Sequence, residues 1–215
     1  MQPKLTDFAA RQGLDFPSDA AERLTAYAQL VWQKKDFLNL TSVECLEEII
    51  TRHVCDGLAA AALFAQRAEG KETFSVADMG SGAGYIGLSI AMALPQAHVS
   101  LVESLEKRCS FLNWAVLKLG LKNVSVRQMR LGQTPLPPFD FITERAMGQL
   151  NDILPLIAPC VTPGGLFAAY QSQPDQAEAA LLVRCGLKAL PAQAYQLPGE
   201  QKERYLALFT RTDAK

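Results

Sequence analysis

Residues 74–87 read FSVADMGSGAGYIG, and this stretch carries most of the information on the fold. A short apolar run ends in an acid, Asp78, and alternating glycines follow at positions 80, 82 and 84. The run is typical of a buried strand, and the glycines let the backbone turn sharply and approach a ligand. Apolar residues at helical spacing, at 86, 90, 91 and 94, predict a helix directly afterwards. We therefore expect a small-molecule site where this strand ends.

The acid distinguishes between two kinds of ligand. Gly82, Gly84 and Gly87 also satisfy the spacing of a dinucleotide-binding loop. A dinucleotide brings a pyrophosphate, which the carboxylate of Asp78 would repel at the helix N-terminus. S-adenosylmethionine brings an ammonium and a sulfonium instead, and Asp78 could hold these groups directly or through water. The alternative is that Asp78 only caps the loop that follows it.

A second acid ends the next predicted strand, which covers Val99 to Glu103. The Glu103 carboxylate could accept hydrogen bonds from both ribose hydroxyls of a nucleoside. It could also be a solvated strand end. The ligand interpretation is favoured because open α/β sheets bind ligands at the carboxyl ends of their strands.

Length, composition and charge limit the class of protein. The 215 residues suit one domain of about 150 to 200 residues with an extension, and the hydrophobic fraction is 49%. Five cysteines without a close pair suggest neither a disulfide framework nor a zinc site, so we expect a cytoplasmic protein. An apolar signal core and a membrane-length apolar run are both missing from the sequence, so we expect no membrane insertion. A net charge of −1 provides no overall basic field, so any RNA would have to meet a local patch.

The pattern along the chain predicts an α/β fold with a helical N-terminal extension. We expect a helix capped by Ser18 that ends before Asn39, and a second helix from Leu46 to Phe64. Strands are predicted near 74–78, 98–103, 124–128, 139–143 and 165–170, with helical patterns between most of them, and a closing pair at 187–197 and 205–209. This alternation is typical of a doubly wound parallel sheet. We expect residues 1–70 to form the extension and residues 71–215 the catalytic domain.

Several segments together resemble one known family. They are Asn39-Leu40-Thr41-Ser42, Arg52-His53 with Asp56, DMGSGAGYIG at 78–87, LVESLEKRCSFL at 101–112, Leu119 to Val124, and Phe139-Asp140 followed by Arg145-Ala146. In this combination the chain resembles the bacterial 16S ribosomal RNA guanine-N7 methyltransferases, historically called glucose-inhibited division protein B. The resemblance implies a Rossmann-like class I methyltransferase fold, with a mostly parallel seven-stranded sheet and helices on both faces. It also implies S-adenosylmethionine as cofactor and 16S rRNA or the small ribosomal subunit as partner. We expect a monomer without a metal.

The resemblance also implies roles for single residues. Cofactor contacts would fall on Gly80, Tyr85, Leu131, Gly132 and Arg145, and Asp78, Gly82 and Glu103 fit the same role by the charge argument above. Asn39, His53 and Asp56 match functional positions of the family, and we take Asn39, His53 and Arg145 as the catalytic candidates. For His53 the alternative is packing or an ion pair with Asp56. For Arg145 it is an ordinary surface or cofactor-side arginine.

The chain departs from the family pattern at several positions. Ile86 stands where a proline is usual, and Gly132 where an acid is usual, which could change adenine recognition. Gln171-Ser172 replaces Lys-Gly, and Arg204-Tyr205 replaces Arg-His, so one cation that could meet rRNA phosphate is missing. Loss of one phosphate contact would weaken RNA binding and its salt dependence without removing cofactor binding.

Four functions remain open on these residues. The leading one is methyl transfer to N7 of a guanine in 16S rRNA. The same chemistry could serve another RNA base, a protein or a small molecule. A ribosome-binding module that keeps the cofactor pocket without turnover is the third, and a nicotinamide oxidoreductase, which Asp78 disfavours, is the fourth.

Overall fold

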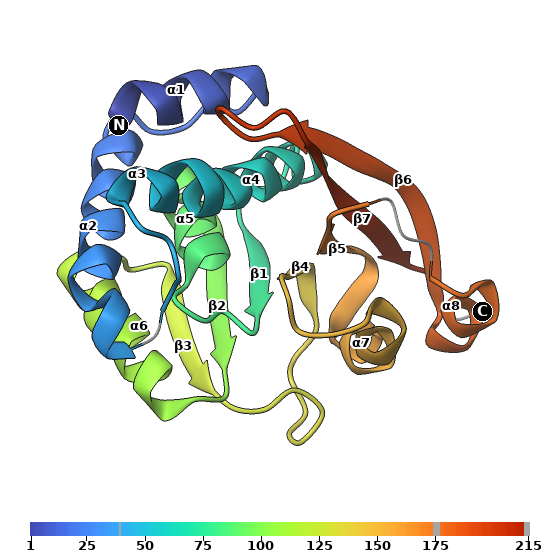
Figure 1. Cartoon of the computed structure of the whole chain (residues 1–215). Helices are drawn as coiled ribbons and strands as arrows, with labels where there is room; N and C mark the ends of the chain where they lie inside the picture. Colours follow the sequence, from blue (N-terminus) through green and yellow to red (C-terminus); the bar gives the residue numbers. More distant parts are fainter. Residues whose placement is uncertain (39, 174–176, 213–215) are drawn as a thin grey trace.

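The computed structural model describes residues 1–38, 40–173 and 177–212. This part of the chain holds a seven-stranded sheet with the strand order β3-β2-β1-β4-β5-β7-β6 (Figure 1). In chain order the strands are β1 Phe74–Met79, β2 Ala97–Glu103, β3 Val124–Gln128, β4 Phe139–Glu144, β5 Val161–Gln171, β6 Leu187–Gln196 and β7 Glu203–Arg211. Every predicted strand is present.

The sheet is mostly parallel, as predicted. Strand β1 lies between β2 and β4 and is parallel to both, while β7 runs antiparallel to its neighbours β5 and β6. Strand β5 begins at Val161, four residues before the predicted start at 165, because the Thr162-Pro163-Gly164-Gly165 segment looks like a turn in the sequence. The β4–β5 register shifts at this point, which accommodates the irregular segment.

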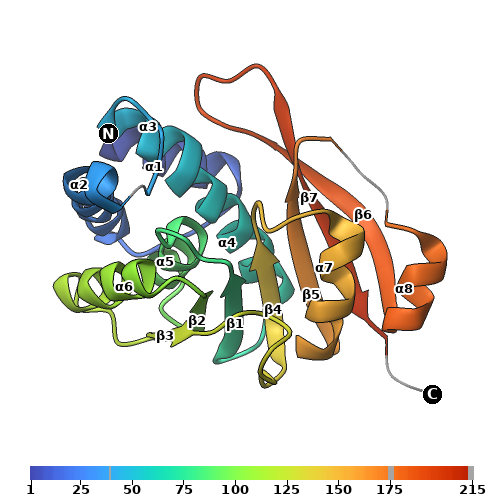
Figure 2. The ribbon, with the colours of Figure 1, turned by 60° about the horizontal axis from the view of Figure 1, so that its bottom comes forward.

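Successive residues of β1 belong to two separate cores, one on each face of the sheet, and Figure 2 shows helices on both faces. The helices are α1 Gln2–Arg11, α2 Ala20–Leu38, α3 Leu46–Glu48, α4 Cys55–Arg67, α5 Tyr85–Ala93, α6 Glu106–Lys118, α7 Leu150–Ile157 and α8 Ala179–Cys185. Val76 of β1 belongs to the core under α1, α2, α4, α5 and α6, whereas Ala77 and Met79 belong to the core under α7 and α8. Burial of both faces explains why β1 and β2 read as nearly continuous apolar runs. The prediction of helices on both faces is confirmed.

The N-terminal helices differ in detail from the prediction. Helix α1, with Pro3 in its first turn, was not predicted. Helix α2 begins at Ala20, so the residue before it is Asp19, and the predicted cap at Ser18 is wrong. The backbone agrees, because the Arg23 N–H donates to the Asp19 carbonyl at 3.0 Å.

The predicted helix from Leu46 to Phe64 is present as a continuous helical segment, but its helix type changes along its length. A π-helical segment, Ile49–Val54, lies between α3 and α4. Such widened turns occur often at functional sites, because they reorient side chains within a helix. Here the segment carries His53.

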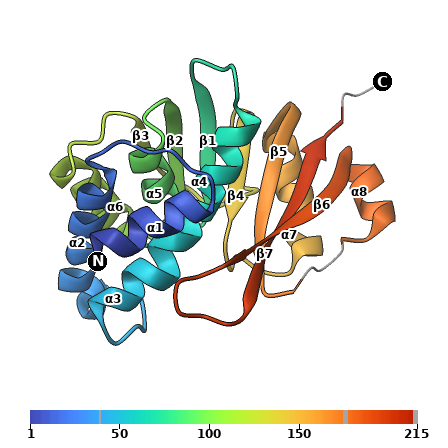
Figure 3. The ribbon, with the colours of Figure 1, turned by 90° about the horizontal axis from the view of Figure 1, so that it is seen from above.

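Residues 1–70 pack on the sheet through a shared core. Leu5, Leu24 and Phe64 belong to the same buried cluster as Leu88 of α5 and Leu101 of β2. Figure 3 shows α1, α2 and α4 gathered over the half of the sheet that contains β1, β2 and β3. No described helix is long and apolar enough to cross a membrane.

The strand order reverses between β1 and β4. From β1 the chain proceeds outward to β2 and β3, then returns to the other side of β1 with β4 and β5. Loops that leave neighbouring carboxyl ends in opposite directions open a crevice between them. The acids of the sequence lie at this edge, since β1 ends just after Asp78 and β2 ends at Glu103.

Candidate functional site

The glycine loop after β1 is a tight turn held by the neighbouring strand. The Gly80 and Ser81 N–H groups both donate to the Val102 carbonyl, at 2.8 and 3.0 Å. Gly80, Gly82 and Gly84 have φ values of +67°, +59° and +86°, in the left-handed region that favours glycine. Gly84 is the residue directly before α5. The backbone conformation therefore explains why glycine occurs at each of these three positions.

Asp78 lies under the first turn of α5. Its side chain is almost fully buried, and Oδ2 accepts a hydrogen bond from the Gly87 N–H at 3.0 Å. The helix can come this close only because residue 87 is glycine: a Cβ there would lie 2.9 Å from Asp78 Cβ and 2.3 Å from Leu101 Cδ2. Burial raises the pKa of Asp78 to about 7, although the Gly87 N–H and Arg145 oppose this shift. The carboxyl group can therefore gain or lose its proton near neutral pH.

Glu103 joins two loops of the site. Its Oε2 accepts from the Gly82 N–H at 2.9 Å, and its Oε1 accepts from the Ser104 and Leu105 N–H groups at 2.8 and 2.9 Å. The carboxylate is nearly buried, with Arg108 Nη1 at 3.7 Å from Oε2. Since each carboxylate oxygen can accept two hydrogen bonds, Oε2 keeps capacity for a ligand.

A cleft of about 700 Å³ lies over these two carboxylates. Among the predicted cofactor residues, the cleft is lined by Asp78, Gly80, Gly82, Tyr85, Glu103, Leu131 and Arg145. Gly132 is not part of the lining. A Cβ at Gly132 would lie 3.0 Å from Leu156 Cδ2, so this glycine packs behind the wall that Leu156 forms.

The apolar wall of the cleft was not predicted. It comes from residues after β3, after β4 and on α7: Met129, Met147, Ile153 and Leu156. The one available signal was helical spacing, since Ile153 and Leu156 lie three residues apart on α7. The sequence shows such a helix, but it does not show which part of the helix faces the crevice.

Tyr85 and His53 stack against each other beside the cleft. Their ring centroids are 4.3 Å apart, and the Arg145 guanidinium lies 5.4 Å from the Tyr85 centroid. The Tyr85 hydroxyl is buried and has no hydrogen-bond partner within the described part of the chain.

Arg145 connects His53 with Asp56. Its Nη1 donates to Asp56 Oδ2 at 2.7 Å and lies 3.3 Å from His53 Nδ1. Burial, with help from Arg145, lowers the pKa of His53 to about 3, so the imidazole is neutral at physiological pH. Because a guanidinium can only donate, Nδ1 accepts and Nε2 carries the proton toward Thr41 Oγ1, 3.2 Å away.

The three catalytic candidates have different outcomes. His53 and Arg145 are brought together, but His53 contacts Arg145 rather than Asp56 and lies behind Tyr85 rather than in the cleft lining. Asn39 lies outside the described residues. Within the described ranges, no three His, Cys, Asp or Glu side chains are gathered as a metal ion would need.

Comparison with known proteins decides the family. The family model described as "GidB: rRNA small subunit methyltransferase G" matches residues 20–202. This chain belongs to the rRNA small subunit methyltransferase G family. It is 32% identical to the protein of that name from Azoarcus sp. (strain BH72), over 97% of this chain and 95% of the relative. With the Sorangium cellulosum member it shares 36% identity over 78% and 71% of the two chains.

Solved structures extend the likeness in fold to more distant methyltransferases. A SAM-dependent methyltransferase from Aquifex aeolicus superposes with a TM-score of 0.53 at 19% identity, covering 75% of this chain and 97% of the other. Coclaurine N-methyltransferase bound to N-methylheliamine and SAH superposes with a TM-score of 0.53 at 13% identity, covering 90% and 74%. At these identities the likeness concerns the fold, and it agrees with the Rossmann-like methyltransferase fold expected for a GidB family member.

Proposed function

We propose that this protein transfers a methyl group from S-adenosylmethionine to N7 of a guanine in 16S rRNA of the small ribosomal subunit. The observation that carries the proposal is the meeting of Asp78, Glu103 and the glycine loop in one cleft at the carboxyl ends of β1 and β2. Membership of the rRNA small subunit methyltransferase G family supports the choice of acceptor. We also propose that the protein acts in the cytoplasm as a monomer.

The residues present fit this cofactor. Ionised Asp78 suits the positive ammonium and sulfonium groups, and the free acceptor capacity of Glu103 Oε2 suits the ribose hydroxyls. Tyr85 and Leu131 both line the cleft, where the Tyr85 ring offers an aromatic surface and the apolar side chain of Leu131 can cover the adenine. Gly132 would act through packing behind Leu156.

The chemistry explains why no catalytic base is needed. When bound, S-adenosylmethionine supplies an electrophilic methyl group: the N7 lone pair forms the new N–C bond, the C–S bond breaks with its electrons staying on sulfur, and N7 loses no proton. The protein then has to hold acceptor and donor in line, an effect that can supply roughly 7 to 11 kcal/mol. His53, neutral and bonded to Arg145, suits a positioning role better than proton transfer.

The decisive test is methyl transfer from labelled S-adenosylmethionine to small subunits from cells that lack this protein. Mass spectrometry of the digested RNA would identify the modified nucleoside. One new 7-methylguanosine is expected. If the cofactor binds in calorimetry but no label enters the RNA, the acceptor is a different molecule or the protein binds ribosomes without turnover.

A further inference from the structure

A second hollow of about 440 Å³ adjoins the cofactor cleft. The two spaces share Arg145 and Ala146 in their linings. Ala146 has a φ of +65° and is the only non-glycine residue with a positive φ in the described ranges. Strained backbone of this kind persists where the surrounding structure holds it, often at ligand sites. The two spaces therefore meet at a segment of backbone with a fixed, unusual conformation.

The hollow carries no net formal charge. Its lining contains three carboxylates, Asp56, Glu200 and Glu203, and three cationic groups, Arg145, Lys202 and Arg204. A site built for a free phosphate would have an excess of positive charge. A balanced set of donors and acceptors suits instead a neutral, polar, planar group.

Aromatic and amide groups complete the lining. Tyr170 and Tyr195 meet edge to face, with centroids 6.5 Å apart, and Gln171 adds an amide at the end of β5. Single-stranded RNA bases are recognised by this combination of aromatic or guanidinium planes and hydrogen-bonding side chains. A base that undergoes chemistry must also leave its stack and enter a pocket.

Asp56 holds the hollow in shape before any ligand arrives. It is fully buried, and its carboxylate accepts from Arg145 at 2.7 Å, from Arg204 at 3.2 Å and from the Tyr195 hydroxyl at 2.7 Å. Glu200 fixes the other side of the Arg204 guanidinium, at 2.9 and 3.1 Å from Nη2. Groups fixed in advance lose little conformational entropy when a ligand binds.

We propose that this hollow receives the acceptor guanine, a step that rests on the proposed methyl transfer. Arg145 and Ala146 border both spaces, so a base seated here lies next to the cofactor cleft and its N7 edge can point toward the methyl donor. The donors on the opposite edge of guanine, N1–H and the 2-amino group, match the carboxylate of Glu203 and the amide oxygen of Gln171. Asp56 acts as a positioning residue for the two arginines.

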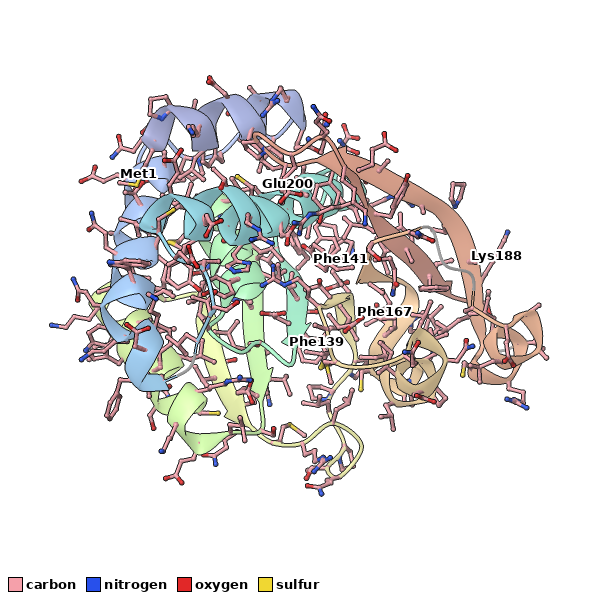
Figure 4. All side chains as sticks on the ribbon, in the orientation of Figure 1. Met1, Phe139, Phe141, Phe167, Lys188 and Glu200 are labelled. Carbon is pink, nitrogen blue, oxygen red and sulfur yellow. The ribbon has the colours of Figure 1, made fainter. Side chains whose placement is uncertain are left out.

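The test compares variants of the hollow with a control at the other end of β6. Gln171→Ala removes the amide, Gln171→Trp fills the space, and Lys202→Ala changes an exposed side chain of the β6–β7 turn. Lys188→Ala is the control, because Figure 4 shows Lys188 at the far end of β6 from Glu200. Filter binding of unmethylated small subunits, calorimetry with S-adenosylmethionine, and the KM and kcat of methyl transfer are measured for each.

We expect Gln171→Ala and Lys202→Ala to weaken subunit binding and raise KM about tenfold, the effect of one lost hydrogen bond or charge contact. Gln171→Trp should abolish methyl transfer. Cofactor affinity should stay within twofold of wild type in all variants, and the control should behave as wild type throughout. If Gln171→Trp fails to fold, Gln171→Ala still decides, because Gln171 is a residue assigned to the edge of the guanine.

Two different results would overturn the assignment of the hollow to guanine, and only one of them would also overturn the proposed function. If all hollow variants bind and methylate subunits as wild type does, the guanine binds elsewhere and the proposed function stands. If wild-type protein methylates no small subunit at all, the proposed function itself fails, and this assignment fails with it.

Discussion

At the scale of single residues, positions 82 and 87 of the site favour glycine for different physical reasons. Gly82 has a φ of +59° but open space around it, with the Gly80 carbonyl 3.9 Å from a built Cβ. Gly87 has an ordinary helical conformation and no space, because Asp78 and Leu101 press against it. Backbone conformation therefore restricts position 82, and packing restricts position 87.

Gly82→Leu and Gly87→Ala should separate these two constraints. We expect Gly82→Leu to cost about 1 to 2 kcal/mol of unfolding free energy, the price of a left-handed conformation, and to block the cofactor cleft. Gly87→Ala should cost about 1 to 3 kcal/mol through overpacking and should displace Asp78. Urea unfolding and calorimetry would check both. Undiminished cofactor binding by the Gly82 variant would contradict the placement of the loop.

The proton on Asp78 should make cofactor binding depend on pH. Burial raises the pKa of Asp78 to about 7, with Glu144 adding to the shift and Arg145 opposing it, while a cationic ligand favours the carboxylate. Affinity for S-adenosylmethionine should therefore fall as pH drops below about 7, by up to about tenfold per pH unit. Asp78→Asn should bind more weakly and without this slope in calorimetry between pH 5.5 and 8.5.

The same shift has a stability consequence of opposite sign. Without ligand, the folded protein keeps a proton on Asp78 between the ordinary pKa of 3.8 and about 7, and the unfolded chain does not. The contribution of Asp78 is thus fully present below about pH 4 and is lost as pH rises through 7. Comparing wild type with Asp78→Asn in urea across this range isolates it.

Glu103 should matter to the loops as well as to the ligand. Glu103→Ala removes the acceptor for three backbone N–H groups, and we expect cofactor affinity to fall by about 1 to 3 kcal/mol. Glu106→Ala, an exposed acid in the first turn of α6, is the matched control. Equal affinities of the two variants in calorimetry would place the ribose elsewhere.

At the scale of elements, one buried carboxylate ties three parts of the fold together. Asp56 in α4 binds Arg145 after β4, Tyr195 in β6 and Arg204 in β7, and its backbone carbonyl accepts from the Tyr170 hydroxyl of β5. The sequence suggested an ion pair of Asp56 with His53, but the side chains that reach it come from much later in the chain. Arg52 of the π-helical segment adds a contact of 3.6 Å to Glu200 in the β6–β7 turn.

Removing the Asp56 carboxylate should lower the free energy of unfolding of the whole protein. Asp56→Ala leaves two arginines and a tyrosine without their common partner, and breaking a buried pair in this way costs about 3 to 5 kcal/mol. Tyr195→Phe removes only one hydrogen bond and should cost about 1 kcal/mol. Chemical denaturation of both variants gives the comparison. Similar losses for the two would mean that the carboxylate is not the centre of the network.

At the scale of the whole molecule, we propose that residues 1–70 and 71–215 unfold together. The helices of the first segment share a single buried core with α5, α6 and the sheet, so separating the two segments would expose this core on both of them. Trp32 in α2 and Trp114 in α6 report on the two segments. Variants with one tryptophan each, Trp32→Phe and Trp114→Phe, should show coincident transitions in urea. Separate midpoints would mean two independent units.

The elements most accurately predicted were those whose burial repeats along the chain. Strands β1 to β4 agree closely with prediction: β1 and β2 are short, mostly apolar runs, and β3 and β4 begin with alternating apolar and polar residues. Helix α1 was missed because it has only three buried positions, Leu5, Phe8 and Ala9. The start of β5 was missed because proline and glycines lie within it.

What the sequence determined by itself was local: the glycine turn, the acids at two strand ends, the alternation of strands and helices, and through them the family. These features can be recognised from residue spacing along the chain, because backbone sterics and strand or helix periodicity act over a few residues. Only the tertiary structure decided that Arg145, Asp56 and Arg204 form one unit, that His53 stacks on Tyr85, and that Gln171 and Lys202 line a hollow beside the cofactor cleft. Contacts between residues 89 to 148 positions apart depend on strand order and helix packing, which no local pattern records.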